Sequence, residues 1–445
     1  QREALSGNLL DVASNVTVLQ MPTSAGKTLL AEFNIIVTKA LRVDAKIVYI
    51  VPSRALVNQV YYDLKLDLEP LDFAIEKTSS AIEIDPTEDS FLNGDDKIDV
   101  LVSTPEKLDL LIRRKHPSVE DVSMFILDEA HTIQNGERGA KLELLLAILR
   151  RERPNAKYML LSPFIKGADK IITEWLGGGN SIAIDWKPSE KLIIGIDTKI
   201  TPKRTKNEIH FEVLQSPYES IQPIGKTIVT NPYAIKSKGD KDKILEFSIR
   251  HFSEEEKAML VLCYGKGTAN TRAEFIYDKI NNFNLNDVLV KKFIEDEVGT
   301  QTTLSKVIEK GIVTHHSGMS DETKLLVEYL IREKHINFVC ATTTIAEGVN
   351  FPVSSVFFDD YRRGQHDKLD ANDFWNIAGR AGRTLVDNYG KIILPFNTDA
   401  NIQNARNLIS SSANVLTSVL AELFENGDII ERKLLEVNGL SDLLM

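Results

Sequence analysis

The string MPTSAGKT, at residues 21–28, constrains the fold of this chain more than any other feature. The run SNVTVLQ before it alternates like a strand, and LLAEFNIIVTKAL after it has apolar residues at helical spacing. The sequence therefore predicts a strand, a tight turn and the N-terminus of a helix. In such a turn, backbone N–H groups and the helix dipole can bind phosphate, with Lys27 adding charge and Thr28 offering a hydroxyl to Mg²⁺.

A second string, NIAGRAGR at residues 376–383, lies far downstream and contains the arginines Arg380 and Arg383. Arginines that complete a phosphate site from a distant segment imply a second domain, which approaches when ATP is bound. The two strings together predict that ATP hydrolysis is coupled to domain motion.

Short β-branched runs alternate with helical patterns, first from KIVYIVP to YMLLSP and again from MLVLCYG to GKIILPF. This alternation is typical of parallel sheets flanked by helices, so the expected fold class is α/β with two tandem domains. Between them lies a segment with strand-like runs broken by Lys-, Pro- and Gly-rich turns. The expected boundaries are 1–187 for domain 1, 188–250 for a β-rich linker or insertion, 251–399 for domain 2, and 400–445 for a helical tail that begins a truncated accessory domain.

Composition narrows the possible partners. The 445 residues carry a net charge of −11, so contact with nucleic acid must come from a local groove. No apolar run reaches the ~20 residues of a membrane span, which predicts a soluble protein with no membrane partner. Cys263 and Cys340 lie in apolar strand-like runs, which favours burial in the core and a cytoplasmic location.

The string DEAH, residues 128–131, directly follows the apolar strand MFIL. Carboxylates at the end of such a strand lie where α/β sheets bind ligands. Beside a phosphate loop, Asp128 is expected to hold Mg²⁺ and Glu129 to orient and deprotonate the attacking water. The alternative is an exposed acidic turn that caps the following helix.

The collinear order of these strings resembles superfamily 2 helicases, most closely the superkiller-like DExH group. The matching segments cover nearly the whole chain: Gln1, MPTSAGKT, VPSRALVNQ, STPEKLD, DEAH, ERGAKLE, LSPF, VLCYGKG, THHSGM, ATTTIAEGVNFP and NIAGRAGR. The resemblance implies that the two α/β domains are tandem RecA-like domains, with ATP and Mg²⁺ as cofactors. It also implies a groove that binds the backbone of one nucleic-acid strand without reading its bases.

The resemblance assigns roles to individual residues. The expected catalytic residues are Glu129, Arg380, Arg383 and Lys27. The expected ATP-binding residues are Gln1, Thr23, Ser24, Ala25, Gly26, Lys27, Thr28, Gly348 and Asn350, and the expected Mg²⁺ ligands are Thr28 and Asp128. The expected nucleic-acid-binding residues are Arg54, Thr104, Lys107 and Thr342.

The segment 359–375, between ATTTIAEGVNFP and NIAGRAGR, has two strand-like flanks around a polar Arg-Arg-Gly turn. In DNA-unwinding members of the resembled group, a β-hairpin at this place separates the strands. Tyr361, Arg362 and Arg363 are therefore expected to form such a hairpin, with Tyr361 stacking on a base at the fork. The alternative is an ordinary surface loop.

Two departures from the family pattern bear on how the ATP state is coupled to strand handling. Pro163 and Phe164 follow Ser162 where the family has Ser-Ala-Thr, and Asn376 replaces a glutamine.

Three functions remain open. The first is a DNA helicase with 3′-to-5′ polarity, favoured by the hairpin; the second is an RNA helicase; the third is a nucleic-acid-triggered ATPase switch that signals to a partner. Single-stranded or tailed duplex nucleic acid is the expected substrate, with a protein partner or a missing C-terminal region completing the grip.

Overall fold

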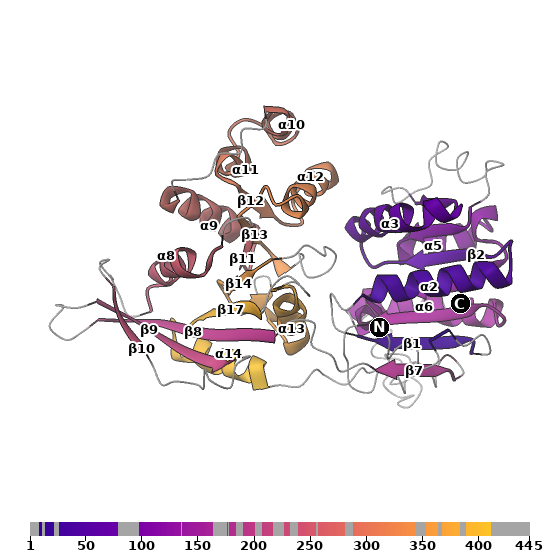
Figure 1. The fold of residues 1–445 in the computed structure, drawn as a ribbon, viewed down its shortest axis with the longest axis horizontal. Helices are drawn as coiled ribbons and strands as arrows, with labels where there is room; N and C mark the ends of the chain where they lie inside the picture. Colours follow the sequence, from indigo (N-terminus) through magenta and orange to yellow (C-terminus); the bar gives the residue numbers. More distant parts are fainter. Residues whose placement is uncertain are drawn as a thin grey trace. The chain divides into compact units, whose positions relative to one another are not determined.

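The computed structural model of the chain describes residues 9–10, 14–21, 26–78, 98–134, 136–162, 176, 178–183, 190–200, 207–216, 227–231, 239–254, 257–280, 288–343, 353–363, 367–382 and 389–410. The chain divides into two compact units (Figure 1). The described residues of the first unit lie within Gln1–Trp186, and those of the second lie within Lys187–Ser412. Each unit is built on its own β-sheet.

The first unit contains a seven-stranded sheet in the order β3-β4-β2-β5-β6-β1-β7, and every neighbouring pair is parallel. Its central strands are runs of apolar residues, as parallel strands covered on both faces require. The strands are β1 (Val16–Gln20), β2 (Lys46–Ile50), β3 (Ile75–Lys77), β4 (Val100–Ser103), β5 (Val122–Leu127), β6 (Lys157–Ser162) and β7 (Asn180–Ala183).

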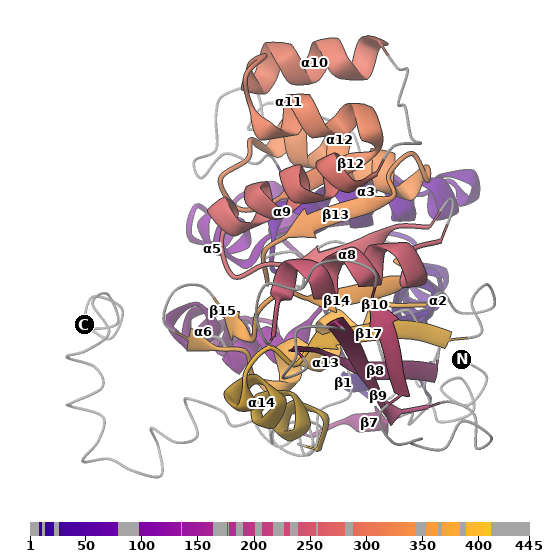
Figure 2. The same cartoon turned by 90° about the vertical axis from the view of Figure 1, so that its left-hand side faces the viewer.

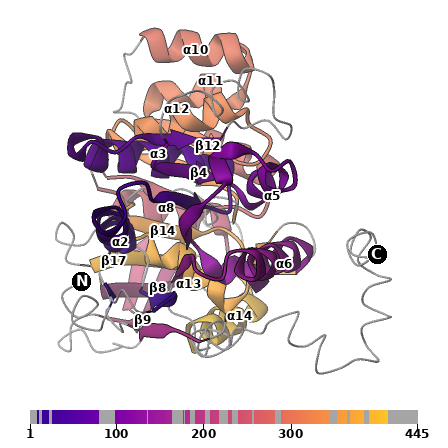
Figure 3. The same cartoon turned by 90° about the vertical axis from the view of Figure 1, so that its right-hand side faces the viewer.

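Helices cover both faces of this sheet (Figure 3). Leu30 of α2 and Leu64 of α3 belong to one core cluster with strand residues such as Tyr49. Leu108 of α5 and Leu145 of α6 belong to a second cluster on the opposite face. The helices are α2 (Lys27–Leu41), α3 (Arg54–Leu68), α5 (Pro105–Arg113) and α6 (Gly136–Glu152), with short 3₁₀ turns η1 (Glu69–Leu71), η2 (Pro117–Val119) and η3 (Ala130–Gln134).

The second unit contains an eight-stranded sheet in the order β10-β9-β8-β17-β14-β11-β13-β12. Pairing is parallel from β8 to β12 and antiparallel for β9 and β10. The strands are β8 (Glu190–Ile200), β9 (Asn207–Gln215), β10 (Thr227–Asn231), β11 (Met259–Leu262), β12 (Ile312–His315), β13 (Phe338–Ala341), β14 (Ser355–Phe358) and β17 (Tyr389–Pro395). The segment expected to be a β-rich linker or insertion therefore supplies β8, β9 and β10, which extend the second sheet.

Helices α8 and α9 pack against one face of the second sheet (Figure 2), where their apolar residues share a core cluster with β11 and β13. Cys263 and Cys340 are buried free thiols, which confirms their expected place in the core. The helices are α8 (Lys241–Phe252), α9 (Lys266–Lys279), α10 (Val288–Val298), α11 (Thr303–Val307), α12 (Asp321–Arg332), α13 (Ala371–Gly379) and α14 (Asp399–Ser410), with a 3₁₀ turn η4 (Ile308–Lys310). A two-stranded ladder joins β15 (Arg362–Arg363) and β16 (Asp367–Lys368).

Two parallel-dominated sheets flanked by helices confirm the expected fold class. The exact domain boundaries stay a prediction. None of the described helices combines the length and the apolar composition that a membrane span requires.

Candidate functional site

The expected phosphate loop lies between β1 and α2. Gly26 has a backbone φ of 86°, in the left-handed region that residues with a Cβ rarely adopt, and α2 begins directly after it. Lys27 is therefore the first helical residue, with only 8% of its surface exposed, and Thr28 follows it half-buried. The strand and helix expected around the loop are in place. Four expected ATP-binding residues, Gln1, Thr23, Ser24 and Ala25, lie outside the described residues.

The two acidic residues expected to act on ATP follow β5. The backbone N–H of Glu129 donates to Oδ1 of Asp128 at 2.8 Å, and the buried Tyr49 hydroxyl donates to Oδ2 at 3.3 Å. Burial raises the pKa of Asp128; Lys27 opposes this shift and Glu129 adds to it. Asp128 is thus a buried carboxyl group whose charged form a bound cation would stabilise.

The fold brings Lys27 and Glu129 together: Lys27 Nζ lies 3.5 Å from Glu129 Oε1. The second carboxyl oxygen, Oε2, lies 3.1 Å from Nδ1 of His131. Strand β6 lies between β1 and β5, and at its end the buried hydroxyl of Ser162 has no hydrogen-bond partner among the described residues. Cationic, hydroxyl and carboxyl groups therefore meet at the carboxyl edge of neighbouring strands, where open α/β sheets bind ligands.

These residues fit a nucleotide with Mg²⁺. The buried Lys27 ammonium has no hydrogen-bond acceptor among the described residues, so a phosphate oxygen suits it. Asp128 and Thr28 supply oxygen atoms of the kind that Mg²⁺ prefers. The described residues contain no group of three or more His, Cys, Asp or Glu side chains that could hold a metal ion. Mg²⁺ does not need one, because phosphates and water usually complete its coordination.

Two of the residues expected to bind nucleic acid begin helices at the same edge of the first sheet. Arg54 is the exposed first residue of α3, and Thr104 caps α5 by accepting a hydrogen bond from the N–H of Lys107 at 3.3 Å. These helices follow the neighbouring strands β2 and β4. Lys107 itself is buried, so Arg54 is the exposed cation among these three residues. Their contacts with nucleic acid stay predictions.

Arg138, at the start of α6, was not singled out from the sequence, although it belongs to the ERGAKLE string. Its Nε lies 2.7 Å from Oε1 of Glu106, and its Nη2 donates to the carbonyl of Pro52. This one guanidinium therefore connects the chain just before α3 to the first turn of α5. Tyr49 was likewise not identified from the sequence, because nothing in an apolar strand indicates that its tyrosine contacts a carboxylate.

The carboxyl edge of the second sheet carries Thr342. Thr342 directly follows β13, and its N–H donates to the carbonyl of His315 at the end of β12, at 3.1 Å. His315 is buried, with Nε2 3.0 Å from Oε1 of Glu328 on α12. This histidine therefore has a partner within the fold. The expected ATP-binding residues Gly348 and Asn350 lie outside the described residues.

The expected arginine segment begins at the end of α13. Arg380 is the C-cap of this helix and is largely buried, whereas Arg383 lies outside the described residues. Gly382 has a φ of 79°, and a Cβ there would lie 2.7 Å from the backbone nitrogen of Gly390, so only glycine fits. Lys191 of β8 donates to the carbonyls of Gly379, at 3.3 Å, and Ala381. These contacts hold the backbone on both sides of Arg380.

The hairpin expected between the last two motifs is present as β15 and β16, in which Arg362 lies opposite Lys368. The expected stacking role of Tyr361 is corrected by its burial. Only 3% of Tyr361 is exposed, and its hydroxyl donates to the carbonyl of Pro395 at 3.2 Å. Its ring packs inside the unit and is not available to a base. Arg362 is exposed, and the side chain of Arg363 lies outside the described set.

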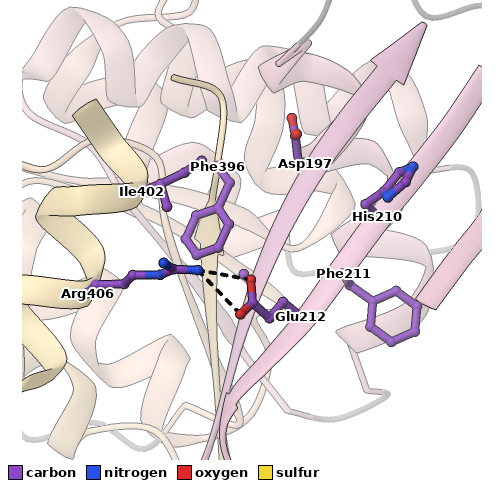
Figure 4. A pocket seen from close by; sticks show the side chains of 8 residues that line it. Asp197, His210, Phe211, Glu212, Phe396, Ile402 and Arg406 are labelled. Carbon is purple, nitrogen blue, oxygen red and sulfur yellow. Dashed lines mark hydrogen bonds and ion pairs between the residues drawn. The ribbon is translucent and has the colours of Figure 1, made fainter. Parts of the chain in front are cut away.

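The second unit also contains a pocket (Figure 4). Phe396 and residues from β8, β9 and α14 line it, and Arg406 lies 3.4 Å from both carboxyl oxygens of Glu212. None of the residues expected from the sequence lines this pocket.

Comparison with known families gives two matches. Residues 1–165 match the DEAD/DEAH box helicase family, and residues 287–384 match the helicase conserved C-terminal domain. The first match contains Lys27, Asp128 and Glu129, and the second contains Arg380 and Arg383.

Three relatives align with most of the chain. The Hachiman protein HamB of Bacillus cereus is 26% identical over 420 residues, which cover 88% of this chain and 36% of the relative. The ATP-dependent DNA helicase Hel308 of Methanococcus vannielii is 27% identical over 418 residues, covering 91% and 52%. Hel308 of Methanocella arvoryzae is 26% identical over 437 residues, covering 94% and 54%.

The chain thus spans between about a third and a half of the length of these relatives. Both halves of the chain match helicase domains, and Glu129 lies 3.5 Å from Lys27 within the first match. The chain belongs to the superfamily 2 helicases.

Proposed function

We propose that this chain is an ATP-dependent nucleic-acid translocase and helicase, directed to DNA, which hydrolyses ATP between two RecA-like domains. The observation that carries the proposal is the contact between Lys27 and Glu129 at the edge of the first sheet, with buried Asp128 beside it. The likeness to two proteins named ATP-dependent DNA helicases supports the choice of DNA. A polarity of 3′ to 5′ follows from the resemblance to the superkiller-like DExH group.

The ion pair between Lys27 and Glu129 suggests how binding prepares hydrolysis. A phosphate oxygen competes with the Glu129 carboxylate for the Lys27 ammonium, because both are anionic acceptors. When Lys27 turns to the phosphate, Glu129 is released to accept a proton from the attacking water. Nδ1 of His131 lies 3.1 Å from the other carboxyl oxygen of Glu129, close enough to contact it during this exchange.

Asp128 and Thr28 are the residues that would hold Mg²⁺ beside the phosphates, and the ion would neutralise phosphate charge there. Arg380 and Arg383 are proposed to supply positive charge to the γ-phosphate in the transition state. The hydrogen bonds from Lys191 to the carbonyls of Gly379 and Ala381 give Arg380 a fixed backbone from which to act. Gly348, Asn350 and Gln1 are proposed to complete nucleotide binding, as the resemblance implies.

Strand binding is proposed to use Arg54, Thr104, Lys107 and Thr342 on the phosphate backbone of one strand. Such contacts position nucleic acid without reading its sequence. The hairpin of β15 and β16 is proposed to separate the duplex. An accessory domain or a partner protein that strengthens the grip also remains a proposal.

The test is ATP turnover measured in parallel with single-stranded DNA and single-stranded RNA of one sequence, followed by unwinding of duplexes with a 3′ or a 5′ tail. We expect stronger stimulation by DNA and unwinding from the 3′ tail, with Lys27→Ala as the inactive control. Preferential stimulation by RNA would identify RNA, and not DNA, as the substrate. Strong stimulation without unwinding of either duplex would instead indicate an ATPase switch.

A further inference from the structure

Arg362 is held in one orientation at the base of the hairpin. Its Nε and Nη2 donate to the two carboxyl oxygens of Asp360, both at 2.9 Å. A two-point contact of this kind fixes the plane of the guanidinium as well as its position. Arg362 is therefore more ordered than a typical surface arginine.

The same guanidinium lies over an aromatic ring. Cζ of Arg362 is 4.3 Å from the centroid of the Tyr264 ring, a close cation–π contact. Tyr264 is half-buried, whereas 46% of the Arg362 side chain is exposed. One face of the guanidinium thus rests on tyrosine, and part of the arginine side chain remains accessible to solvent.

Contacts of Asp359 and Asp360 anchor the chain beneath this pair. Asp359, fully buried, lies 2.8 Å from Nε of Arg272 and 3.2 Å from Nζ of Lys241, and its N–H donates to the carbonyl of Leu262 at 2.9 Å. Asp360 is also within 3.8 Å of Lys241. The chain that carries Arg362 is therefore anchored to α8, α9 and β11 before the hairpin begins.

The position in the sheet links this pair to the expected groove. Tyr264 follows β11 and Thr342 follows β13, and these strands are neighbours, so their ends lie about 5 Å apart across the sheet. Asp360 and Arg362 follow β14, on the other side of β11. A strand bound at Thr342 would therefore pass close to Tyr264 and Arg362.

We propose that Arg362, stacked on Tyr264 and oriented by Asp360, is the surface on which a base of the DNA fork stacks. A guanidinium plane stacks on any base, so the contact is independent of sequence. This inference rests on the proposed helicase function and gives the hairpin the stacking residue that buried Tyr361 does not provide.

The experiment measures the affinity of forked DNA with a 3′ tail by fluorescence anisotropy without ATP, while an abasic site is moved one nucleotide at a time across the junction. For the wild-type chain, we expect one position at which loss of the base weakens binding by about 5- to 150-fold. Arg362→Ala should weaken binding of the intact fork by a similar factor. At that one abasic position, Arg362→Ala should cause no further loss.

Two further variants separate stacking from charge. Arg362→Lys keeps the positive charge but lacks the plane, so it should bind the intact fork as weakly as Arg362→Ala. Tyr264→Phe keeps the ring and should bind like the wild type, whereas Tyr264→Leu should not. The matched control is Arg406→Ala, another exposed arginine of this unit that pairs with a carboxylate and should leave binding unchanged.

Wild-type affinity in Arg362→Lys, or equal weakening by Arg362→Ala at every abasic position, would overturn the proposal in favour of a phosphate contact. The same conclusion follows if no abasic position is coupled to Arg362. Failure of the helicase function itself looks different, because then the wild-type chain neither binds forked DNA nor hydrolyses ATP faster when single-stranded DNA is added.

Discussion

The carboxyl edges of the two sheets use their charged residues in opposite ways. In the first unit, one cation, Lys27, lies 3.5 Å from Glu129 and close to buried Asp128, so carboxyl groups outnumber cations. In the second unit, the buried carboxylate of Asp359 lies beside two cations, Arg272 and Lys241. One architecture can therefore leave carboxyl groups in excess at its edge, where a bound cation would be favoured, or place cations around a buried carboxylate and anchor the chain there.

The difference has an energetic consequence. A buried carboxyl group such as Asp128 costs free energy to ionise, and a bound cation can offset that cost, so the first edge should respond strongly to nucleotide with Mg²⁺. A buried ion pair is costly to break but contributes little beyond a well-packed apolar substitute. Substitutions at the second edge should therefore change the stability and geometry of the second unit. They should change ATP turnover only where they affect Arg380 or Arg383.

The largest effect is expected at the first edge. Glu129→Gln should keep ATP binding but reduce turnover by about 10²- to 10⁴-fold, because the amide cannot accept a proton from water. Lys27→Ala should lose turnover and also bind ATP more weakly, because a ground-state phosphate contact is removed. The measurements are steady-state hydrolysis and equilibrium binding of a fluorescent ATP analogue. Normal turnover in Glu129→Gln would remove this residue as the base.

The next largest effect is expected on stability at the second edge. Arg272→Met leaves buried Asp359 with Lys241 alone and should destabilise the second unit by about 3–5 kcal/mol. The double variant with Asp359→Leu should recover most of that loss, because no uncompensated charge remains. Calorimetric unfolding checks both variants, and Arg406→Ala serves as a surface-pair control expected to cost at most about 1 kcal/mol. An unchanged melting temperature in Arg272→Met would refute the view that this network supports the hairpin.

A smaller effect is expected for the exposed cation at the first edge. Arg54→Ala should weaken binding of single-stranded DNA of any sequence alike and lower the salt dependence of log K by about one unit. The reason is that a single phosphate contact is lost. Titrations at several salt concentrations measure the slope, with Arg151→Ala, an exposed arginine at the end of α6, as the control. Loss confined to particular sequences would contradict a backbone contact.

The smallest effect is a change in the stability of the first unit with pH. Burial, together with Asp67 and Asp63, raises the pKa of Glu32 on α2 from 4.5 to about 7. A carboxyl group with a higher pKa in the folded state stabilises the fold most below pH 4.5 and loses that contribution as the pH rises to about 7.

Glu32→Gln should therefore raise the melting temperature of the first unit by a few degrees at pH 8, equivalent to about 1–2 kcal/mol, and very little at pH 5. Thermal unfolding at both pH values tests this, with the exposed Glu152→Gln as the control. An equal gain at both pH values would show that the ionisation of Glu32 is not the cause.

Much of the first edge could be predicted from the sequence because its signals are local. A glycine, a lysine and a helical pattern after an apolar strand predict the turn at Gly26, and an acidic pair after another apolar strand predicts Asp128 and Glu129. Parallel strands then bring these residues to one edge without further information. The partners that position them, such as Tyr49, come from other strands and leave no local signal.

The second edge was harder to predict because its contacts join distant parts of the chain. Tyr361 stands in a polar turn-like string, yet its hydroxyl reaches the carbonyl of Pro395 and its ring is buried. Tyr264 lies nearly a hundred residues before Arg362, the cation that covers it. The pairing of β8 with β17 is equally remote, and strand-like runs alone cannot show which strands become neighbours.

We propose that the first edge hydrolyses ATP only with an arginine from the second unit. The most direct test is ATP turnover by Arg383→Ala in saturating single-stranded DNA, measured together with ATP affinity and melting temperature. We predict a loss of about 10³- to 10⁵-fold in turnover with a much smaller loss of affinity and an unchanged melting temperature. Turnover at the wild-type rate would contradict a motor in which both units act on one ATP.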